Sequence, residues 1–213
     1  MNHIRVLFRG VLAVVAVLTV LTAVLPAASA EDAHVYRIDP KQSGFLVNTG
    51  VTGLFKKFGK PLTMEVLNYS GTIRFNPQEP NAAAVNIQTK ANSVALKTQV
   101  CEPDRMNIEM RMHEKVLESE KFPDIQYVSD KVQGWKKGDN SYDVEIQGTL
   151  TLHGSSRSLP LHATATLRGN RLEASGEIPL SQKDFGIKSY SYEGGALRVA
   201  DEVKISFNLV AIH

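Results

Sequence analysis

Apolar and polar residues alternate along most of the chain. The clearest run lies between Tyr142 and Gly154, where every second residue is apolar or glycine and the residues between are mostly polar. A period of two over this length is typical of a β-strand with one buried face. The same alternation returns in three later runs, Leu159–Leu167, Leu172–Leu180 and Val203–Ala211. We expect a strand at each of them.

Turn-forming residues separate the first three of these runs. Gly154-Ser155-Ser156 follows the first run, and Gly169-Asn170 follows the second. The Gly-Asn pair is typical of a tight hairpin turn. The three runs are therefore expected to form an antiparallel meander, and the run from Val203 to Ala211 is the last strand of the chain.

Shorter alternating segments fill the first half of the chain. Strands are expected at Phe45–Val51, Leu62–Phe75, Val85–Thr89 and Ile125–Val132. The segment Val94–Gln99 either extends the third of these strands or follows a bend. About eight strands in total predict a mostly β fold, which is a sandwich or a closed barrel.

One segment breaks the alternation. Between Arg105 and Lys121 the chain is rich in Met, Glu and Lys, and a helix that ends before Phe122-Pro123 is expected there. Residues spaced by three or four along it predict one face of an amphipathic helix. They are Met106, Met110, His113 or Glu114, and Leu117. Such a helix either lies over the end of a barrel as a lid or plugs the end of a filled core.

The first thirty residues predict export. Residues 1–30 combine Arg5 and Arg9 with an apolar run from Val11 to Leu25 and the small triplet Ala28-Ser29-Ala30. These features indicate a secretory signal peptide that is cleaved between Ala30 and Glu31. A retained anchor is the alternative, but the run is shorter than the roughly 20 residues that cross a bilayer. We expect one domain, 31–213, in a periplasmic or secreted protein.

Charge and cysteine content exclude several classes of protein. The chain has 24 Lys and Arg against 22 Asp and Glu, and the expected cleavage removes two of the basic residues. The balanced charge that remains argues against nucleic acid as a partner. Cys101 is the only cysteine, so no intramolecular disulfide forms. Its thiol is inert, reactive, or paired across a homodimer. No spacing predicts a haem, a metal site or another cofactor.

Residues for catalysis are few. The motifs of zinc proteases, α/β-hydrolases and phosphate-binding loops are absent from the sequence. His153 lies at an expected strand end near Ser155, where a polar turn explains it better than a catalytic pair. No catalytic residue is therefore expected, and a lipid-acting hydrolase or isomerase with His153 or His162 as its base stays as an alternative.

Small residues on the inward-facing positions suggest a cavity. An eight-stranded barrel holds either large side chains or one ligand. The small residues are Gly148, Ala163, Ala165, Ala174 and Gly176. They either leave space for a ligand or mark bends and interleave with bulky neighbours. Because the wall would be aliphatic and aromatic, a hydrocarbon chain would suit the cavity, and added bulk at Ala165 or Gly176 would lower ligand affinity.

The segment Gly53–Lys60 joins two expected strands. It interleaves Phe55 and Phe58 with three lysines. The aromatic residues could face lipid while the lysines meet an anionic head group, in a transient contact with a membrane. A structural turn with a solvated basic face explains the segment equally well.

Several stretches together resemble the YceI-like polyisoprenoid-binding family. They are YRIDPKQSGFLV (Tyr36–Val47), GLFKKFGK (Gly53–Lys60), FPDIQY (Phe122–Tyr127), GTLTLHG (Gly148–Gly154), KDFGI (Lys183–Ile187) and VADEVKISFNLVA (Val199–Ala211). The resemblance implies an extended, eight-stranded, lipocalin-like antiparallel β-barrel with one helix near an apolar pore. It also implies pore-facing side chains, which by position are Phe45, Val47, Phe55, Phe75, Val144, Ile146 and Phe185.

The resemblance further implies a secreted bacterial protein that holds a long isoprenoid or a similar amphiphile. The helical stretch departs from the family pattern, because Met106, Met110 and Met112 occur in it. Methionine adapts to irregular surfaces, so the entrance could accept a different molecule. We therefore expect a carrier or sequestering protein for an isoprenoid, an isoprenoid quinone or a fatty-acid-like amphiphile. An interaction module of a membrane redox or assembly complex is the alternative.

Overall fold

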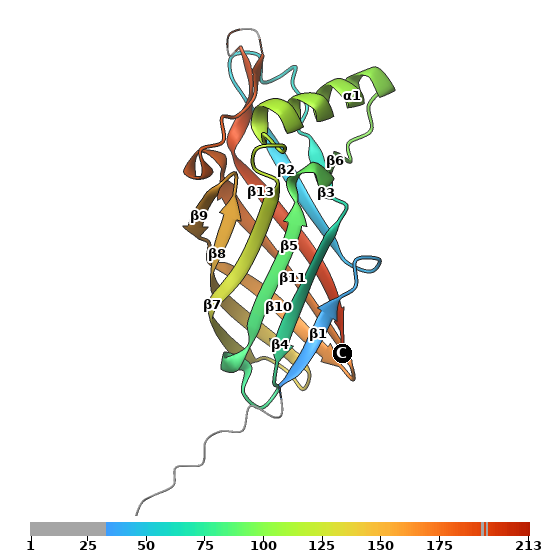
Figure 1. Cartoon of the computed structure of the whole chain (residues 1–213), viewed down its shortest axis with the longest axis vertical. Helices are drawn as coiled ribbons and strands as arrows, with labels where there is room; N and C mark the ends of the chain where they lie inside the picture. Colours follow the sequence, from blue (N-terminus) through green and yellow to red (C-terminus); the bar gives the residue numbers. More distant parts are fainter. Residues whose placement is uncertain (1–32, 193, 195) are drawn as a thin grey trace, which may run out of the picture. The chain divides into compact units, whose positions relative to one another are not determined.

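Antiparallel strands close into a barrel in this computed structural model, which describes residues 33–192, 194 and 196–213 (Figure 1). The expected signal peptide and its cleavage site at Ala30 lie outside the described residues. The ring runs in the order β1, β4, β5, β7, β8, β10, β11, β13, and pairing of β13 with β1 closes it. Its strands are β1 (His34–Ile38), β4 (Tyr69–Phe75), β5 (Ala84–Lys90), β7 (Asp124–Lys136), β8 (Ser141–Leu152), β10 (Leu161–Arg168), β11 (Arg171–Ser181) and β13 (Leu197–Ile212). The predicted mostly β, eight-stranded antiparallel barrel is confirmed.

Three further strands extend the sheet beyond this ring. They are β2 (Gly44–Thr52), β3 (Thr63–Val66) and β6 (Val94–Leu96), and they pair in the order β13, β2, β3, β6. The strand expected over Leu62–Phe75 is thus two strands, β3 and β4, interrupted at Leu67 and Asn68. A turn of 3-10 helix, η3 (Ala91–Ser93), separates β5 from β6. The segment that begins at Val94 therefore follows a bend and does not extend the preceding strand.

The remaining elements lie in the connections. They are the short strands β9 (Ser155–Ser158) and β12 (Ser191–Tyr192), which pair with β8 and β13, and the 3-10 turns η2 (Pro80–Ala82) and η5 (Gln182–Phe185). The turn expected at Gly154-Ser155-Ser156 is therefore tighter than predicted, because Ser155 already belongs to β9. His153 and Gly154 make this turn, and both have positive φ.

The α-helix of the described residues is shorter than predicted. It is α1 (Glu102–Arg111), and it continues into a π-helical turn, η4 (Met112–Val116). Pro103 in its first turn and the acidic residues Glu102 and Asp104 favour a helix start. No helix in the described part of the chain is both long and apolar enough to cross a membrane.

Polar side chains of α1 bind the free edge of β6. Glu109 Oε1 accepts a hydrogen bond of 2.8 Å from the Leu96 amide, and the Arg105 guanidinium donates to the Leu96 carbonyl. These bonds pair backbone groups of a strand that has only β3 as its neighbour in the sheet. The helix therefore covers an edge that would otherwise be open.

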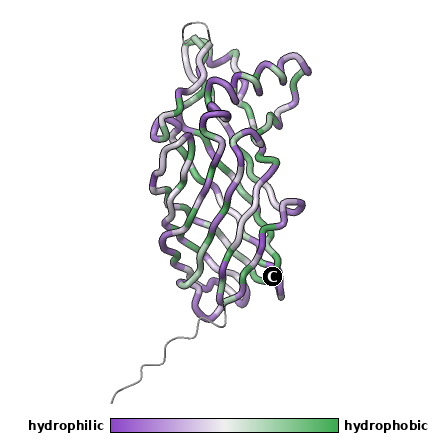
Figure 2. Tube along the Cα trace, in the orientation of Figure 1, coloured by the Kyte–Doolittle hydropathy of each residue, from purple (hydrophilic) through white to green (hydrophobic). Residues whose placement is uncertain are grey.

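Large aromatic side chains pack the interior at the end of the barrel far from α1. Tyr36 of β1 is 2% exposed, and the rings of Phe75 and Tyr142 meet edge to face, with their centroids 5.1 Å apart. Ala211 of β13 is fully buried. Figure 2 shows the alternation of hydrophobic and hydrophilic residues along the strands that brings these side chains inside. One end of the barrel is thus a filled core.

Two inward glycines make room for aromatic rings. A Cβ at Gly176 would lie 2.7 Å from Phe207 Cζ and 2.5 Å from the His162 carbonyl oxygen, and a Cβ at Gly148 would collide with the Tyr127 ring. The expectation that these small residues leave free space is wrong for both positions. Neighbouring rings fill it.

We expect Gly176→Ala to lower the free energy of unfolding by about 1–3 kcal/mol, because the new methyl group must displace the Phe207 ring or the backbone. Gly44→Ala is the matched control, since nothing lies within 4 Å of its Cβ position. Urea denaturation of both variants measures the difference. Equal stability of the two variants would contradict this account of Gly176.

Candidate functional site

A cavity of about 470 Å³ occupies the barrel interior toward α1. This volume lies within the range of small-molecule sites. Ile108, Met112 and Leu117 of the helical segment contribute to its wall, together with inward residues of the strands. Phe75 and Tyr142, in the packed end, do not line it. The barrel is therefore hollow at one end and solid at the other.

Uncharged polar groups in the interior of the cavity are bound by the protein itself. The Tyr127 hydroxyl donates to the Leu159 carbonyl at 3.1 Å, and Thr49 Oγ1 donates to the Leu62 carbonyl at 3.2 Å. Thr89 Oγ1 donates to the Asn68 carbonyl. Among the described residues, every fully buried side-chain nitrogen or oxygen has a partner. The wall thus offers a ligand apolar contact in its interior.

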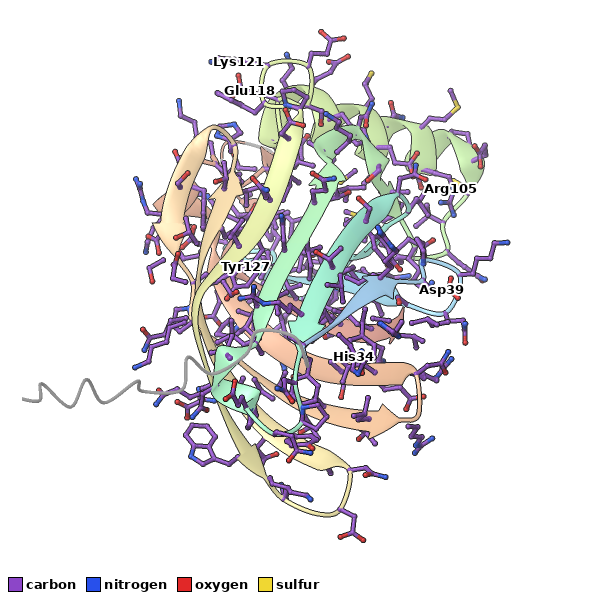
Figure 3. The ribbon with its side chains drawn as sticks, turned by 60° about the horizontal axis from the view of Figure 1, so that its bottom comes forward. His34, Asp39, Arg105, Glu118, Lys121 and Tyr127 are labelled. Carbon is purple, nitrogen blue, oxygen red and sulfur yellow. The ribbon has the colours of Figure 1, made fainter. Side chains whose placement is uncertain are left out.

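Burial keeps the tyrosines of the wall neutral. It raises the pKa of Tyr127 well above its ordinary value of 10.0, and the nearby Asp130 carboxylate adds to the effect. Burial also raises the pKa of Tyr69, with a smaller contribution from Asp39. Tyr127 lies part way along β7 in Figure 3. Its phenol therefore stays protonated at neutral pH and does not place a charge in the cavity.

Charged side chains occur on the cavity wall only near its α1 end, and all of those described there are positive. They are Lys60, Arg111 and Arg198. Arg111 ends α1 and donates a hydrogen bond to the Tyr190 hydroxyl, with its guanidinium carbon 5.4 Å from the centre of the Tyr190 ring. We call this set, Lys60, Arg111, Arg198 and Tyr190, the cationic mouth.

Three of the residues predicted to face the pore line the cavity. Phe45 and Val47 come from β2, and Ile146 comes from β8. Phe45 packs edge to face on Tyr69, with ring centroids 4.9 Å apart. Contact of these three side chains with a ligand stays a prediction.

The structure places the other predicted residues away from this wall. Phe75 and Ala165 are buried in the packed core, and Phe185 is buried in η5. Val144 is half-buried and packs against the core, and Gly176 adjoins the Phe207 ring.

Phe55 is also outside the cavity. Its side chain is exposed in the β2–β3 loop, where its ring lies 6.3 Å from that of Phe58. Phe55, which the family resemblance assigns to the pore, therefore lies in the exposed β2–β3 loop and not inside the pore.

The helical residues on the wall were not those that the sequence pattern indicated. Met106 and Met110 are exposed, whereas Ile108, Met112 and Val116 face the cavity. The predicted face is wrong because Met106 and Met110, although apolar, lie on the exposed side of α1, and the side that packs on the barrel carries Ile108. Of the predicted set, Leu117 lines the cavity.

Neither candidate histidine base reaches the cavity wall. His153 Nε2 lies 2.9 Å from Glu118 Oε2, and its Nδ1 lies 3.2 Å from the Phe185 carbonyl, so the ring ties the end of the helical segment to η5. The side chain of His162 is 78% exposed on the outer surface and lies near Glu145. Neither ring is therefore placed to act on a molecule in the cavity.

Cys101 and the acidic residues form no recognisable metal site. Within the described residues, no group of three or more His, Cys, Asp or Glu side chains could hold a metal ion. Cys101 is exposed immediately before α1, and its thiol lies 3.1 Å from Asp104 Oδ2. Pairing of this thiol across a dimer stays a prediction.

We expect the phenol of Tyr127 to titrate well above pH 10, so that its part of the tyrosinate absorbance at high pH is missing in Tyr127→Phe. Because the folded pKa of Tyr127 exceeds the unfolded value near 10, stability is unaffected below pH 10 and falls as pH rises above it. The melting temperature of Tyr127→Phe should therefore fall less steeply above pH 10 than that of the parent protein. Identical slopes would contradict the burial of this hydroxyl.

Comparisons with known proteins agree with this architecture. Protein YceI of Salmonella newport is 31% identical over 160 residues, which cover 71% of this chain and 75% of that protein. A UPF0312 protein of Pseudomonas savastanoi pv. phaseolicola is 29% identical over 179 residues, covering 81% of this chain and 86% of its own.

Solved structures share the fold at low sequence identity. BcnA of Burkholderia cenocepacia superposes with a TM-score of 0.65 at 20% identity, over 82% of this chain and 99% of that one. A polyisoprenoid binding domain from Saccharophagus degradans gives a TM-score of 0.61 at 16% identity, over 84% and 99% of the two chains. The sequence profile of the YceI-like domain matches residues 36–211. This chain is therefore a member of the YceI-like domain family.

Proposed function

We propose that this protein is a carrier or sequestering protein that binds a long-chain amphiphile, such as an isoprenoid, an isoprenoid quinone or a fatty-acid-like molecule, without chemistry of its own. We further propose that it is exported, loses residues 1–30 and works in the periplasm or outside the cell. The observation that carries the proposal is a cavity of about 470 Å³ whose interior polar groups are already bound by the protein.

Withdrawal of a hydrocarbon chain from water supplies the binding free energy. Each buried methylene contributes about 0.8 kcal/mol, so a chain gains affinity with each carbon that enters the cavity. An added polar group in the interior would lose its water without finding a free partner. The similar domain from Saccharophagus degradans is a polyisoprenoid binding domain, which supports the same class of ligand for this chain.

Native mass spectrometry of the exported protein, followed by organic extraction, tests the carrier proposal. We expect a stoichiometric long-chain species in the parent protein and its loss in Ala174→Phe, which places a ring inside the cavity wall. Ser175→Phe is the matched control, because Ser175 is exposed on the opposite face of β11. An empty parent protein that also fails to bind added geranylgeraniol or a fatty amide would overturn the proposal.

A variant at Ala165, the cross-strand neighbour of Ala174, distinguishes a cavity from a packed core. Ala165 pairs with Ala174 across β10 and β11 but is buried in the packed core. We expect Ala165→Phe to lower the free energy of unfolding by about 1–3 kcal/mol, because the ring overpacks the core. Thermal denaturation should show a smaller effect for Ala174→Phe, and equal destabilisation by both would indicate a filled interior.

We also propose that the protein meets its ligand at a membrane through the loop between β2 and β3. Leu54 is 91% exposed and Phe58 is 83% exposed at the tip of this loop. Lys56, Lys57 and Lys60 are exposed between and beside them. No ion pair of these lysines occurs among the described residues. Apolar tips flanked by lysines suit an anionic bilayer, where each lysine contributes about 1 kcal/mol.

Sedimentation with vesicles tests this contact. We expect binding to vesicles of phosphatidylcholine with phosphatidylglycerol, weak binding to phosphatidylcholine alone, and loss of binding in the double variant Leu54→Ser/Phe58→Ser. Val35→Ser/Leu67→Ser removes two other exposed apolar side chains and is the control. Equal binding by both double variants, or a stable complex with a protein in place of vesicles, would overturn the membrane contact.

A further inference from the structure

The mouth of the cavity is charged with one sign. Three basic residues, Lys60, Arg111 and Arg198, lie on the cavity wall, and the described wall residues include no Asp or Glu. We propose that the cationic mouth binds the anionic head group, a carboxylate or a phosphate monoester, of the amphiphile whose chain fills the cavity. This inference rests on the proposed carrier function and names the chemical class of its ligand.

Pairing and packing bring three separate segments together at this mouth. Arg198 of β13 pairs with Thr52 at the end of β2. Gly59 packs so closely against Val51 and Leu197 that a Cβ there would lie 2.6 Å from the first and 2.7 Å from the second. Lys60 follows directly, so the loop returns next to the start of β13. Figure 1 shows this loop beside the hairpin of β12 and β13, at the same end as α1.

Arg111 comes from the helix, and Tyr190 precedes β12. The two side chains are held together by the hydrogen bond from Arg111 to the Tyr190 hydroxyl and by stacking of the guanidinium over the ring. This bond engages one of the five donors of the guanidinium. Among the described residues, no carboxylate forms an ion pair with Arg111.

Three acidic side chains at this end, Glu109, Glu118 and Asp201, are bound to other groups. Glu109 accepts from the Leu96 amide, and Glu118 lies 2.9 Å from the His153 ring. Asp201 accepts from the Lys183 amide and the Ser181 hydroxyl, each at 2.9 Å, and these bonds lower its pKa. Figure 3 shows Glu118 and Lys121 at the α1 end of the barrel, away from His34. Within the part of the chain that the structure describes, the basic residues of the mouth have no acidic neighbour on the cavity wall.

An anionic head group completes this arrangement. Guanidinium groups bind carboxylate and phosphate through strong charge-assisted hydrogen bonds. The apolar cavity beside them lowers the local dielectric constant and strengthens the attraction. A neutral head group would gain less, and a cationic one would be repelled. The chain would lie inward from the mouth, and the head would lie at its rim.

Matched ligands test the charge preference. We would measure the affinities of the mature protein for geranylgeranyl monophosphate and geranylgeraniol, and for palmitate and palmitamide, by titration calorimetry. We expect each anionic ligand to bind about ten- to a hundredfold more tightly than its neutral partner. The two pairs also distinguish phosphate from carboxylate as the preferred head group.

Variants locate the preference at the mouth. Arg198→Gln should weaken binding of each anionic ligand more than binding of its neutral partner and so reduce the difference within each pair. Arg74→Gln removes the same charge from an exposed position of β4 and should leave the difference intact. Equal affinity within both pairs, or equal loss in both variants, would overturn the anionic head group but leave the carrier function standing. Failure of all four ligands to bind would overturn the carrier function itself.

Discussion

The packed end of the barrel is the constraint on which the rest of the structure depends. Tyr36, Phe75 and Tyr142 fill the interior there, and the pairing of β1 with β13 closes the ring around them. A continuous core of this kind stabilises the whole barrel by burial of apolar surface. The other end can therefore keep an unfilled volume, which would be costly in a core that had to stabilise the fold alone.

The hollow end needs other means of stability. Here β6 has a single neighbour in the sheet, and the gap beside it is covered by a helix rather than by another strand. Hydrogen bonds from the helix, a histidine between two loops and a π-helical turn replace the regular ladder. Irregular elements gather where the wall must bend around a space, and the charged residues of the wall lie there as well.

Alternation in the sequence predicts which side chains point inward but not how far along the axis they lie. Phe45 and Ile146 line the cavity, whereas Phe75 and Ala165 have the same inward orientation and belong to the core. Depth depends on strand tilt and register, which no local pattern contains. Spacing alone also does not identify the helix face, because Met106 and Met110 are apolar but exposed, whereas Ile108 and Met112 of the same helical segment line the cavity. Arg111 and Arg198 lie far apart in sequence, so only the fold reveals the cationic mouth.

The attachment of α1 to β6 has a consequence for the rate at which a bound molecule can leave. Lifting the helix from the barrel would break both hydrogen bonds to Leu96 and would also separate Ile108 and Met112 from the apolar cluster around Leu96. Leaving a buried backbone group without a partner costs about 1–3 kcal/mol. Escape beneath the helix therefore has an activation barrier to which these two backbone groups add, over and above the hydrocarbon surface that the ligand must expose, so a ligand that leaves on that side does so more slowly than its buried surface alone would require.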